Sequence, residues 1–297
     1  MLGTSERDIV NEKIYILLPV HNRRETTSRF ISSLNAQSYR NFHLVLIDDG
    51  STDGTAEMVR ESVEPLTVIR GSGNWWWAGS LQQGYDWLQS QNLELSDLVL
   101  MINDDTEFTP EFLQSAVHLM QDPNRTILVA WCYCRETGRL VDAGVHVDWS
   151  RLAFQPAAPP HEINCLSTNG LFMRLSDLFA TGGFRPALLP HYASDYEFTI
   201  RAHRMGMRLT SDPACHLRLD QGTTGYHELY AGSMAGSLRR IFSRRSTRNP
   251  FMWCAFILLS CPWRYWAINI YRAWANFLYD ICRLAKFQAL DWKRRLL

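Results

Sequence analysis

Three polar residues at the end of an apolar segment are the first candidates for chemistry in this sequence. Residues 98–102 (LVLMI) are typical of a buried strand, and Asn103, Asp104 and Asp105 follow directly. Carboxylates often cap a helix, but residues 109–111 (TPE) already carry that signature for the next helix. Because Mg²⁺ and Mn²⁺ prefer oxygen ligands, the two aspartates indicate a cation or diphosphate site, with a purely structural role as the alternative.

Polar clusters also follow three other apolar segments in the first half of the chain. The sequences PVHNR, DDGSTDG and GSGNWWWAG stand at the ends of segments 13–20, 43–49 and 66–71, and a helical pattern comes after each. Short apolar strands that alternate with helices predict an α/β fold with a mostly parallel, doubly wound sheet flanked by helices. Ligands of such sheets bind beyond the carboxyl ends of the strands, so we expect these clusters to line one site.

The pattern loosens after about residue 127. TILVAWCY predicts another strand, and GRLVDAGVHVDW contains the turn and the alternation typical of a hairpin. Residues 194–206 (SDYEFTIRAHRMG) predict a helix with Ser194 as its candidate cap and Gly206 at its end.

The composition is that of a globular protein with a large core. Of 297 residues 46% are hydrophobic, and 30 basic and 30 acidic side chains give a net charge of +0, so no global charge argues for a nucleic-acid partner. The seven cysteines include no CxxC pair, which favours reduced thiols over a disulfide framework or a zinc site. The N-terminus, MLGTSERDIVNEK, is polar and charged, so we expect no secretory signal and a cytoplasmic location.

Residues 231–297 differ in character from the rest of the chain. Five arginines fall within ten residues: Arg239, Arg240, Arg244, Arg245 and Arg248. The apolar run 251–263 is shorter than the roughly 20 residues of a membrane span, and a mixture of Trp, Tyr and Arg follows it. This pattern predicts an amphipathic helical region that attaches to a membrane surface. The alternative is an ordinary helical subdomain or a dimer interface.

Taken in order, the motifs resemble those of the inverting glycosyltransferases of family 2, among them rhamnosyltransferase-like enzymes of surface polysaccharide synthesis. The resemblance rests on ILLPVHNR, LVLIDDGSTDGT, NDD, GGF and SDYEFTIRAHRMG, and extends over residues 13–225. It implies a GT-A fold, which is Rossmann-like, for residues 1–230. The nucleotide-sugar half would take in about residues 1–105 and the acceptor half about residues 106–230.

The resemblance also implies roles for individual residues. The candidates for nucleotide-sugar binding are Pro19, His21, Asn22, Arg23, Asp48, Asp49, Asn74, Asn103 and Asp104. The candidates for holding Mg²⁺ or Mn²⁺ are Asp105 and His216, and those for acceptor binding are Trp75, Trp76, Trp77 and Asn169. Asp195 matches the catalytic base. The chain departs from the family's pattern at Asn103, where the DxD motif has an aspartate, and at Ser194, where a glutamate normally precedes the base.

Physical arguments bear on four of these assignments. A carboxylate can accept a hydrogen bond from a pyrimidine N–H, and Asp49 is favoured over Asp48 for that contact. A sugar hydroxyl is a poor nucleophile until a base removes its proton, although Asp195 could also be a first-turn acid favoured by the helix dipole. A lone histidine such as His216 is more often structural than a ligand. Of the three consecutive tryptophans, two are expected in the core.

These observations predict a metal-dependent, inverting glycosyltransferase. It would move a sugar from a nucleotide diphosphate-sugar, preferably a UDP- or dTDP-sugar, to a hydroxyl of a glycan or lipid-linked acceptor in O-antigen or lipopolysaccharide-type synthesis. Rhamnose is favoured on the resemblance alone, and the enzyme would lie on the inner face of the cell membrane. One alternative is an inactive sugar-nucleotide or glycan binding module, suggested by Asn103 and Ser194. The other is a sugar nucleotidyltransferase, against which PVHNRRE lacks a glycine-rich phosphate loop.

Overall fold

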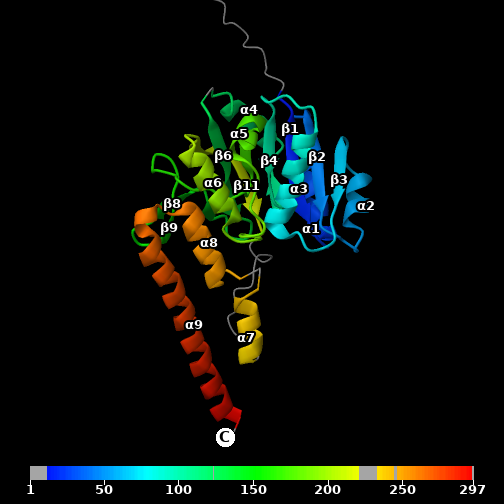
Figure 1. Ribbon diagram of the computed structural model, residues 1–297. Coiled ribbons are helices and arrows are strands. Elements are labelled where there is room, and N and C mark those ends of the chain that lie inside the picture. The colour runs from blue at the N-terminus through cyan, green and yellow to red at the C-terminus, as the bar shows by residue number, and fades with distance from the viewer. Residues whose placement is uncertain (1–11, 123, 221–232, 244–245, 296–297) are drawn as a thin grey trace, which may run out of the picture.

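The computed structural model describes residues 12–122, 124–220, 233–243 and 246–295 (Figure 1). A nine-stranded sheet forms its centre, in the order β3-β2-β1-β4-β10-β6-β11-β5, with β7 paired to β6. The fold is mixed α/β, as the sequence predicts.

The first four strands run parallel to one another and alternate with helices. They are β1 (Ile14–Val20), β2 (Phe42–Asp48), β3 (Leu66–Arg70) and β4 (Leu98–Met101), and the helices are α1 (Arg24–Asn35), α2 (Thr55–Arg60) and α3 (Trp76–Ser90). Successive strand residues face opposite sides of the sheet, so Ile14, Ile16 and Leu18 enter one core and Tyr15 and Leu17 enter the other. Both faces are covered, which explains why these strands read as continuous apolar runs.

The second half of the sheet contains strands of both directions. Its elements are β5 (Thr106–Phe108), α4 (Phe112–Leu119), β6 (Thr126–Cys134), β7 (Leu140–Asp142), β10 (Leu171–Arg174), α5 (Leu175–Thr181), α6 (Ser194–Arg204) and β11 (Arg208–Leu219). Strand β10 is antiparallel to β4 and β6, whereas β11 is parallel to β6. One core lies under α1, α2 and α4, and the other under α3, α5 and α6.

Three local expectations differ from the structure. The segment 138–149 does not form a hairpin with itself, because β7 pairs with β6 while β8 (Val145–Asp148) pairs with β9 (Ala153–Pro156). Helix α4 begins at Phe112, after the TPE sequence, and the Leu113 N–H donates to Oε1 of Gln37 at 3.0 Å. Ser194 is the first residue of α6 rather than its cap, and its hydroxyl donates to the His191 carbonyl at 2.7 Å. For α4 a partner distant in sequence caps the helix, whereas for Ser194 the partner is three residues away.

All seven cysteines are free thiols, as the sequence predicts.

The C-terminal helices lie at the end of the sheet where β1 to β4 finish (Figure 1). They are α7 (Met234–Ile241), α8 (Pro250–Ser260), the 3-10 turn Trp263–Tyr265 and α9 (Trp266–Arg295). Helix α8 is buried against α6 and the β8–β9 hairpin, and Arg204 of α6 donates to the Leu259 and Ser260 carbonyls at its end. Helix α8 is therefore packed onto the sheet domain, while α9 extends away from it.

Candidate active site

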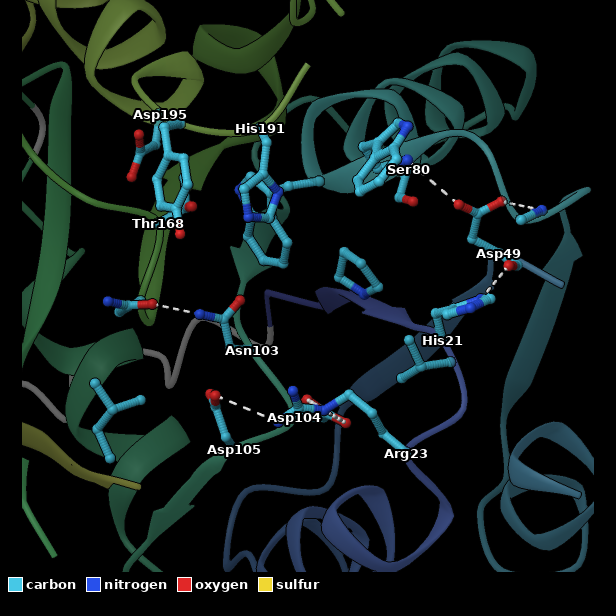
Figure 2. Close-up of a pocket in the computed structure, with 18 residues that line it drawn as sticks. His21, Arg23, Asp49, Ser80, Asn103, Asp104, Asp105, Thr168, His191 and Asp195 are labelled. Carbon is cyan, nitrogen blue, oxygen red and sulfur yellow. Dashed lines mark hydrogen bonds and ion pairs between the residues drawn. The ribbon is translucent and has the colours of Figure 1, made fainter. Parts of the chain in front are cut away.

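A cavity of 660 Å³ opens where the first four strands end (Figure 2). We call it the donor cavity. Its lining comprises Pro19, Val20, His21, Arg23, Asp49, Gly73, Trp76, Trp77, Ser80, Asn103, Asp104, Asp105, Thr168, Asn169, His191, Tyr192, Asp195 and Leu219. The polar clusters that follow β1, β2, β3 and β4 thus meet in one place, because the carboxyl ends of parallel strands share an edge of the sheet.

Most of the residues singled out in the sequence line this cavity, but five do not: Asn22, Asp48, Asn74, Trp75 and His216. The Asp48 carboxylate accepts the Ser51 N–H at 2.8 Å and shapes the turn after β2. Asn22 accepts the Thr52 N–H at 2.8 Å, which joins the loops after β1 and β2. These two side chains therefore hold the loops that line the cavity, although neither side chain lines it.

Asp104 and Asp105 lie together with Arg23. The Arg23 guanidinium is 2.9 Å from an Asp104 oxygen and 3.4 Å from an Asp105 oxygen. The Thr27 hydroxyl also donates to Asp104, at 2.9 Å. Burial raises the pKa of Asp104 to about 6, against the lowering effects of Arg23 and Thr27. Among the described residues, Arg23 therefore contacts both buried carboxylates.

The carboxylates fit one kind of divalent-cation site. Among the described side chains no group of three or more His, Cys, Asp or Glu could cage a metal. Mg²⁺ is, however, commonly held by one or two carboxylates together with substrate phosphates. Asp105, beside Asp104 in the cavity lining, matches that donor set.

His216 does not form a metal site with Asp104 and Asp105. It lies on β11 outside the donor cavity, with Nδ1 3.0 Å from the Pro213 carbonyl oxygen and its ring edge-on to Tyr133. We therefore omit His216 from the candidate metal site.

Asn103 makes a contact that the motif alone does not reveal. Its amide donates to Oδ1 of Asn169 at 2.5 Å, across the junction between the ends of β4 and β10 (Figure 2). This hydrogen bond joins the NDD motif at the end of β4 to Asn169, which precedes β10. The asparagine that replaces the usual aspartate therefore has a defined partner.

The Asp49 carboxylate organises the start of α3. It accepts the backbone N–H groups of Gly73 and Trp75 at 2.8 Å and that of Trp76 at 3.3 Å. A side chain at Gly71 would clash with Asp49 and with the Trp75 ring, both 2.6 Å from the Cβ position. A glycine is thus required where the chain passes between these two groups. Asp49 lines the donor cavity while it holds this loop.

The three tryptophans divide between packing and the cavity. Trp75 and Trp77 pack against the core under α3, as expected for two of the three. Trp76 faces the donor cavity with a backbone φ of 60°, and its ring lies edge-on to His191, 6.5 Å between centroids. A bulky residue with positive φ is strained, and such strain is concentrated at functional sites.

Asp195 occupies the first turn of α6, at the side of the donor cavity opposite Arg23 and Asp104 (Figure 2). Its Oδ1 accepts the Tyr196 N–H at 2.9 Å. Burial raises the pKa of this carboxyl to about 6, although the N–H groups of Tyr196 and Thr168 lower it, and the charge of Asp142 raises it further. A carboxylate with this pKa is ionised at neutral pH and binds a proton more strongly than an exposed one, as a general base requires.

Neighbouring residues hold α6 in position. Glu197 is buried and forms a two-point ion pair with Arg201, with both N–O distances 3.0 Å. Arg201 also donates to the carbonyls of Thr181 and Gly183, and Phe184 stacks on Phe198 with centroids 4.8 Å apart. The GGF motif therefore has a structural task here, which is to anchor the helix that carries Asp195.

Some lining residues were not identified from the sequence: Val20, Gly73, Ser80, Thr168, His191, Tyr192 and Leu219. His191 and Tyr192 had the clearest signal, because imidazole and phenol groups stand shortly before the helix whose second residue is the candidate base. Thr168 and Leu219 carry no such signal, and only the folding of the sheet brings them to the cavity.

Comparisons with known proteins identify the family of this chain. The family model described as glycosyl transferase family 2 matches residues 15–175, more than half of the chain. The chain belongs to this family.

Relatives and solved structures are similar to it over different lengths. EpsE of Bacillus subtilis (strain 168), named as a glycosyltransferase, is 24% identical over 66% of this chain and 68% of its own length. Glycosyltransferase GlyA of Streptococcus pneumoniae is 34% identical, but the match covers 19% of this chain and only 8% of GlyA. A mannosyltransferase of Pyrobaculum calidifontis, solved with GDP-Man and Mn²⁺, matches 94% of this chain and 87% of its own with a TM-score of 0.53 and 14% identity. S. aureus TarS matches 91% of this chain and 54% of its own with a TM-score of 0.57 and 20% identity. These two similarities, at 14% and 20% identity, show that this chain has the GT-A fold.

Proposed function

We propose that this glycosyltransferase moves a sugar, with inversion, from a nucleotide diphosphate-sugar to a hydroxyl group of a glycan. The observation that carries the proposal is the position of Asp195, which faces the donor cavity from the side opposite Arg23 and Asp104 (Figure 2). A base in that place can act on the face of the sugar away from the diphosphate. Attack from that face inverts the anomeric carbon.

In the proposed reaction, Asp195 accepts the proton of the acceptor hydroxyl as its oxygen bonds to the anomeric carbon. The bond from that carbon to the diphosphate oxygen breaks, and the nucleotide diphosphate leaves with the electron pair. Asp104 and Asp105 would hold Mg²⁺ or Mn²⁺, which when bound neutralises charge on the departing diphosphate. Arg23 orients both carboxylates for that role through its ion pairs.

For the donor we propose a UDP- or dTDP-sugar, with rhamnose as the favoured sugar. Asp49 and His21 lie where β2 and β1 end, and His21 Nδ1 is 2.6 Å from the Asp49 carbonyl oxygen, so the two form one wall for the base. The similar mannosyltransferase was solved with GDP-Man. GalNAc-T7, which matches 78% of this chain and 48% of its own with a TM-score of 0.58 and 16% identity, was solved with UDP. These ligands support a nucleotide donor but do not choose between bases.

Calorimetric titration with UDP, dTDP, GDP and CDP, each with and without Mn²⁺, tests the donor and the metal together. We expect metal-dependent binding of UDP or dTDP, and loss of the metal dependence in Asp105→Asn. If a folded sample binds none of the four, the inactive module becomes the better description. If GDP binds alone, the donor proposal is wrong and the site proposal stands.

We further propose a lipid-linked acceptor and attachment at the inner face of the cell membrane. Helix α9 packs on the protein through one stripe, Asn269, Ala273, Asp280 and Leu284. The opposite side presents exposed apolar residues, Ile268, Tyr271, Leu278 and Tyr279, which we call the apolar face of α9. Arg283 and Lys286 are exposed beside this face, as in helices that lie on anionic lipid, whereas Arg272 donates to the Ser150 carbonyl and to Asn269 on the packed side.

The five arginines within residues 239–248 contribute less positive charge to this attachment than their number implies. Arg248 is paired with Asp280 at 2.6 Å, so its charge is neutralised within the protein. Arg244 and Arg245 lie outside the described residues. None of the helices in the described part of the chain is long and apolar enough to span a bilayer.

A further inference from the structure

A second cavity, of 490 Å³, lies on the other side of Asp195. It shares Asn169, Tyr192, Asp195 and Leu219 with the donor cavity. The residue proposed as the base thus belongs to the walls of both cavities. A group in the second cavity could present a hydroxyl to Asp195 while the donor cavity is filled.

One side of this second cavity is polar. The Asp142 carboxylate, at the end of β7, accepts the Ser167 hydroxyl at 2.5 Å and the Gly144 N–H at 3.0 Å. Ser167 and Asn169, which precede β10, lie in the same lining. Carboxylate, hydroxyl and amide groups are the side chains that hydrogen-bond sugar hydroxyls.

The other side is aromatic and comes mainly from the C-terminal helices. Helix α8 supplies Trp253 and Phe256, and β9 supplies Phe154. Phe154 stacks on Tyr196 with centroids 5.6 Å apart and lies edge-on to Trp253 at 5.9 Å. A pyranose ring has hydroxyls at its edge and apolar C–H groups on its faces, and a cavity with one polar and one aromatic side is complementary to it.

The charged side chains in the lining of this second cavity favour some classes of sugar over others. The described lining contains Asp142 and Asp195 but no Lys or Arg. Two carboxylates would repel a uronic acid or a sugar phosphate, whereas a neutral sugar meets no penalty.

We propose that this cavity, the acceptor chamber, binds a terminal neutral sugar of the acceptor between Asp142 and Trp253, and that α8 is thereby part of the active site. The proposal rests on the proposed function, because it takes Asp195 as the group that receives the proton of the bound sugar. It also moves the acceptor away from Trp75, Trp76 and Trp77: Trp76 and Trp77 line the donor cavity and Trp75 lines neither.

The test is saturation-transfer NMR on the full chain with para-nitrophenyl glycosides as probes: neutral glycosides of glucose, galactose, mannose, rhamnose and N-acetylglucosamine, and the glucuronide. The samples contain Mg²⁺ and the nucleotide diphosphate that calorimetry identifies. We expect at least one neutral glycoside to bind, and the glucuronide to bind at least about tenfold more weakly than its glucose counterpart. Binding of no neutral glycoside, or equal binding of the glucuronide, overturns the proposal.

Two variants locate the binding. We expect Trp253→Ala to weaken the neutral glycoside about tenfold or more while nucleotide affinity stays within about twofold. Trp131→Ala is the matched control, because Trp131 is also a half-buried tryptophan with one indole hydrogen bond but lies outside both cavities. Equal effects of the two variants overturn the assignment.

Asp142→Asn gives a readout that does not depend on the stability of α8. It removes one of the two negative charges, so the preference for the glucoside over the glucuronide should fall by about tenfold. An unchanged preference contradicts the chamber. Failure of nucleotide binding in the wild type is a different result: it counts against the proposed function, and the glycoside titration without nucleotide still decides the chamber.

Discussion

At the scale of single residues, the environment of Asp195 bears on its proposed role as the base. Asp195 is half-buried near Asp142, Tyr196 and Cys165. Burial raises the pKa of the Tyr196 and Cys165 groups, so both stay neutral and Asp142 is the charged neighbour. The sequence motif identified Asp195, but its burial and its place between two cavities depend on β7, β10 and α6 together.

Asp195→Asn is expected to lower kcat by about 10²- to 10⁴-fold, because the amide cannot take the hydroxyl proton. Nucleotide affinity should be unchanged. Steady-state kinetics and calorimetry measure the two quantities. Asp86→Asn, an exposed acid bonded to Gln82, is the control, and near-normal turnover in Asp195→Asn would show that the base is another group.

The same substitution should stabilise the protein. At pH 7 the folded chain holds an ionised carboxylate whose pKa is raised from 3.8 to about 6, and this opposes folding. Removing the charge should raise the free energy of unfolding by about 2 kcal/mol at pH 7. The gain should shrink as the pH falls from about 6 and disappear below about pH 3, where Asp195 is protonated in both folded and unfolded chains. Urea unfolding at the two pH values measures it, and a gain independent of pH would contradict the electrostatic cause.

The raised pKa also predicts the pH dependence of transfer. The base must be ionised, so kcat at saturating donor and acceptor should be constant above about pH 7 and fall about tenfold per unit below about pH 6. Initial rates from pH 5 to 8 measure this profile. A rate that is flat down to pH 5 would contradict the assignment of Asp195.

At the scale of elements, the loops that bear the site are held in uncommon backbone conformations. Asn22, Trp76 and Ala193 have φ of 51°, 60° and 62°, and each lies in a loop or helix start beside the donor cavity. Side chains from other elements compensate for such strain. For the start of α3 the compensating side chain is Asp49, which lies at the end of β2. The sequence predicts the helix, but it does not show that its first turn depends on a carboxylate more than 20 residues earlier.

Asp49→Asn should therefore loosen the start of α3. The amide has one acceptor oxygen for three backbone N–H groups, so we expect the free energy of unfolding to fall by about 2 kcal/mol, together with weaker nucleotide binding. Asp48→Asn, at the neighbouring position with a single backbone N–H, should cost about 1 kcal/mol or less. Urea unfolding and calorimetry compare the two. Equal losses would show that the contacts with α3 contribute little.

At the scale of the whole molecule, the C-terminal quarter has two parts with different surroundings. Helix α8 is buried against α6 and the β8–β9 hairpin, as in an ordinary helical subdomain. Helix α9 keeps exposed apolar residues on the side that faces away from the protein. The single amphipathic region predicted from the sequence is thus one packed helix and one amphipathic helix.

Membrane attachment should depend on the apolar face of α9. Exchanging Tyr271 and Leu278 together for serine should weaken binding to vesicles with anionic lipid at least about tenfold, because large apolar side chains each contribute roughly 1.5–3 kcal/mol when fully buried. The unfolding temperature should not change, since Tyr271 is 68% and Leu278 58% exposed. Co-sedimentation measures the binding, with Leu95→Ser as the control at an exposed site before β4. Unchanged partitioning would contradict the proposed attachment.

The sequence by itself determined the α/β architecture and the edge of the sheet that carries the site. Apolar runs of strand length that end in polar residues and alternate with helices are compatible with few other folds. Parallel strands also bring their carboxyl ends to the same edge of the sheet, whatever the order of the strands. Only the tertiary structure decided which side chains meet. Asn103 donates to Asn169 at a separation of 66 residues, His216 lies outside the donor cavity although Leu219 of the same strand lines it, and α8 lines the same cavity as Asp195. Such contacts depend on the orientation of whole helices and strands, which short-range patterns do not encode.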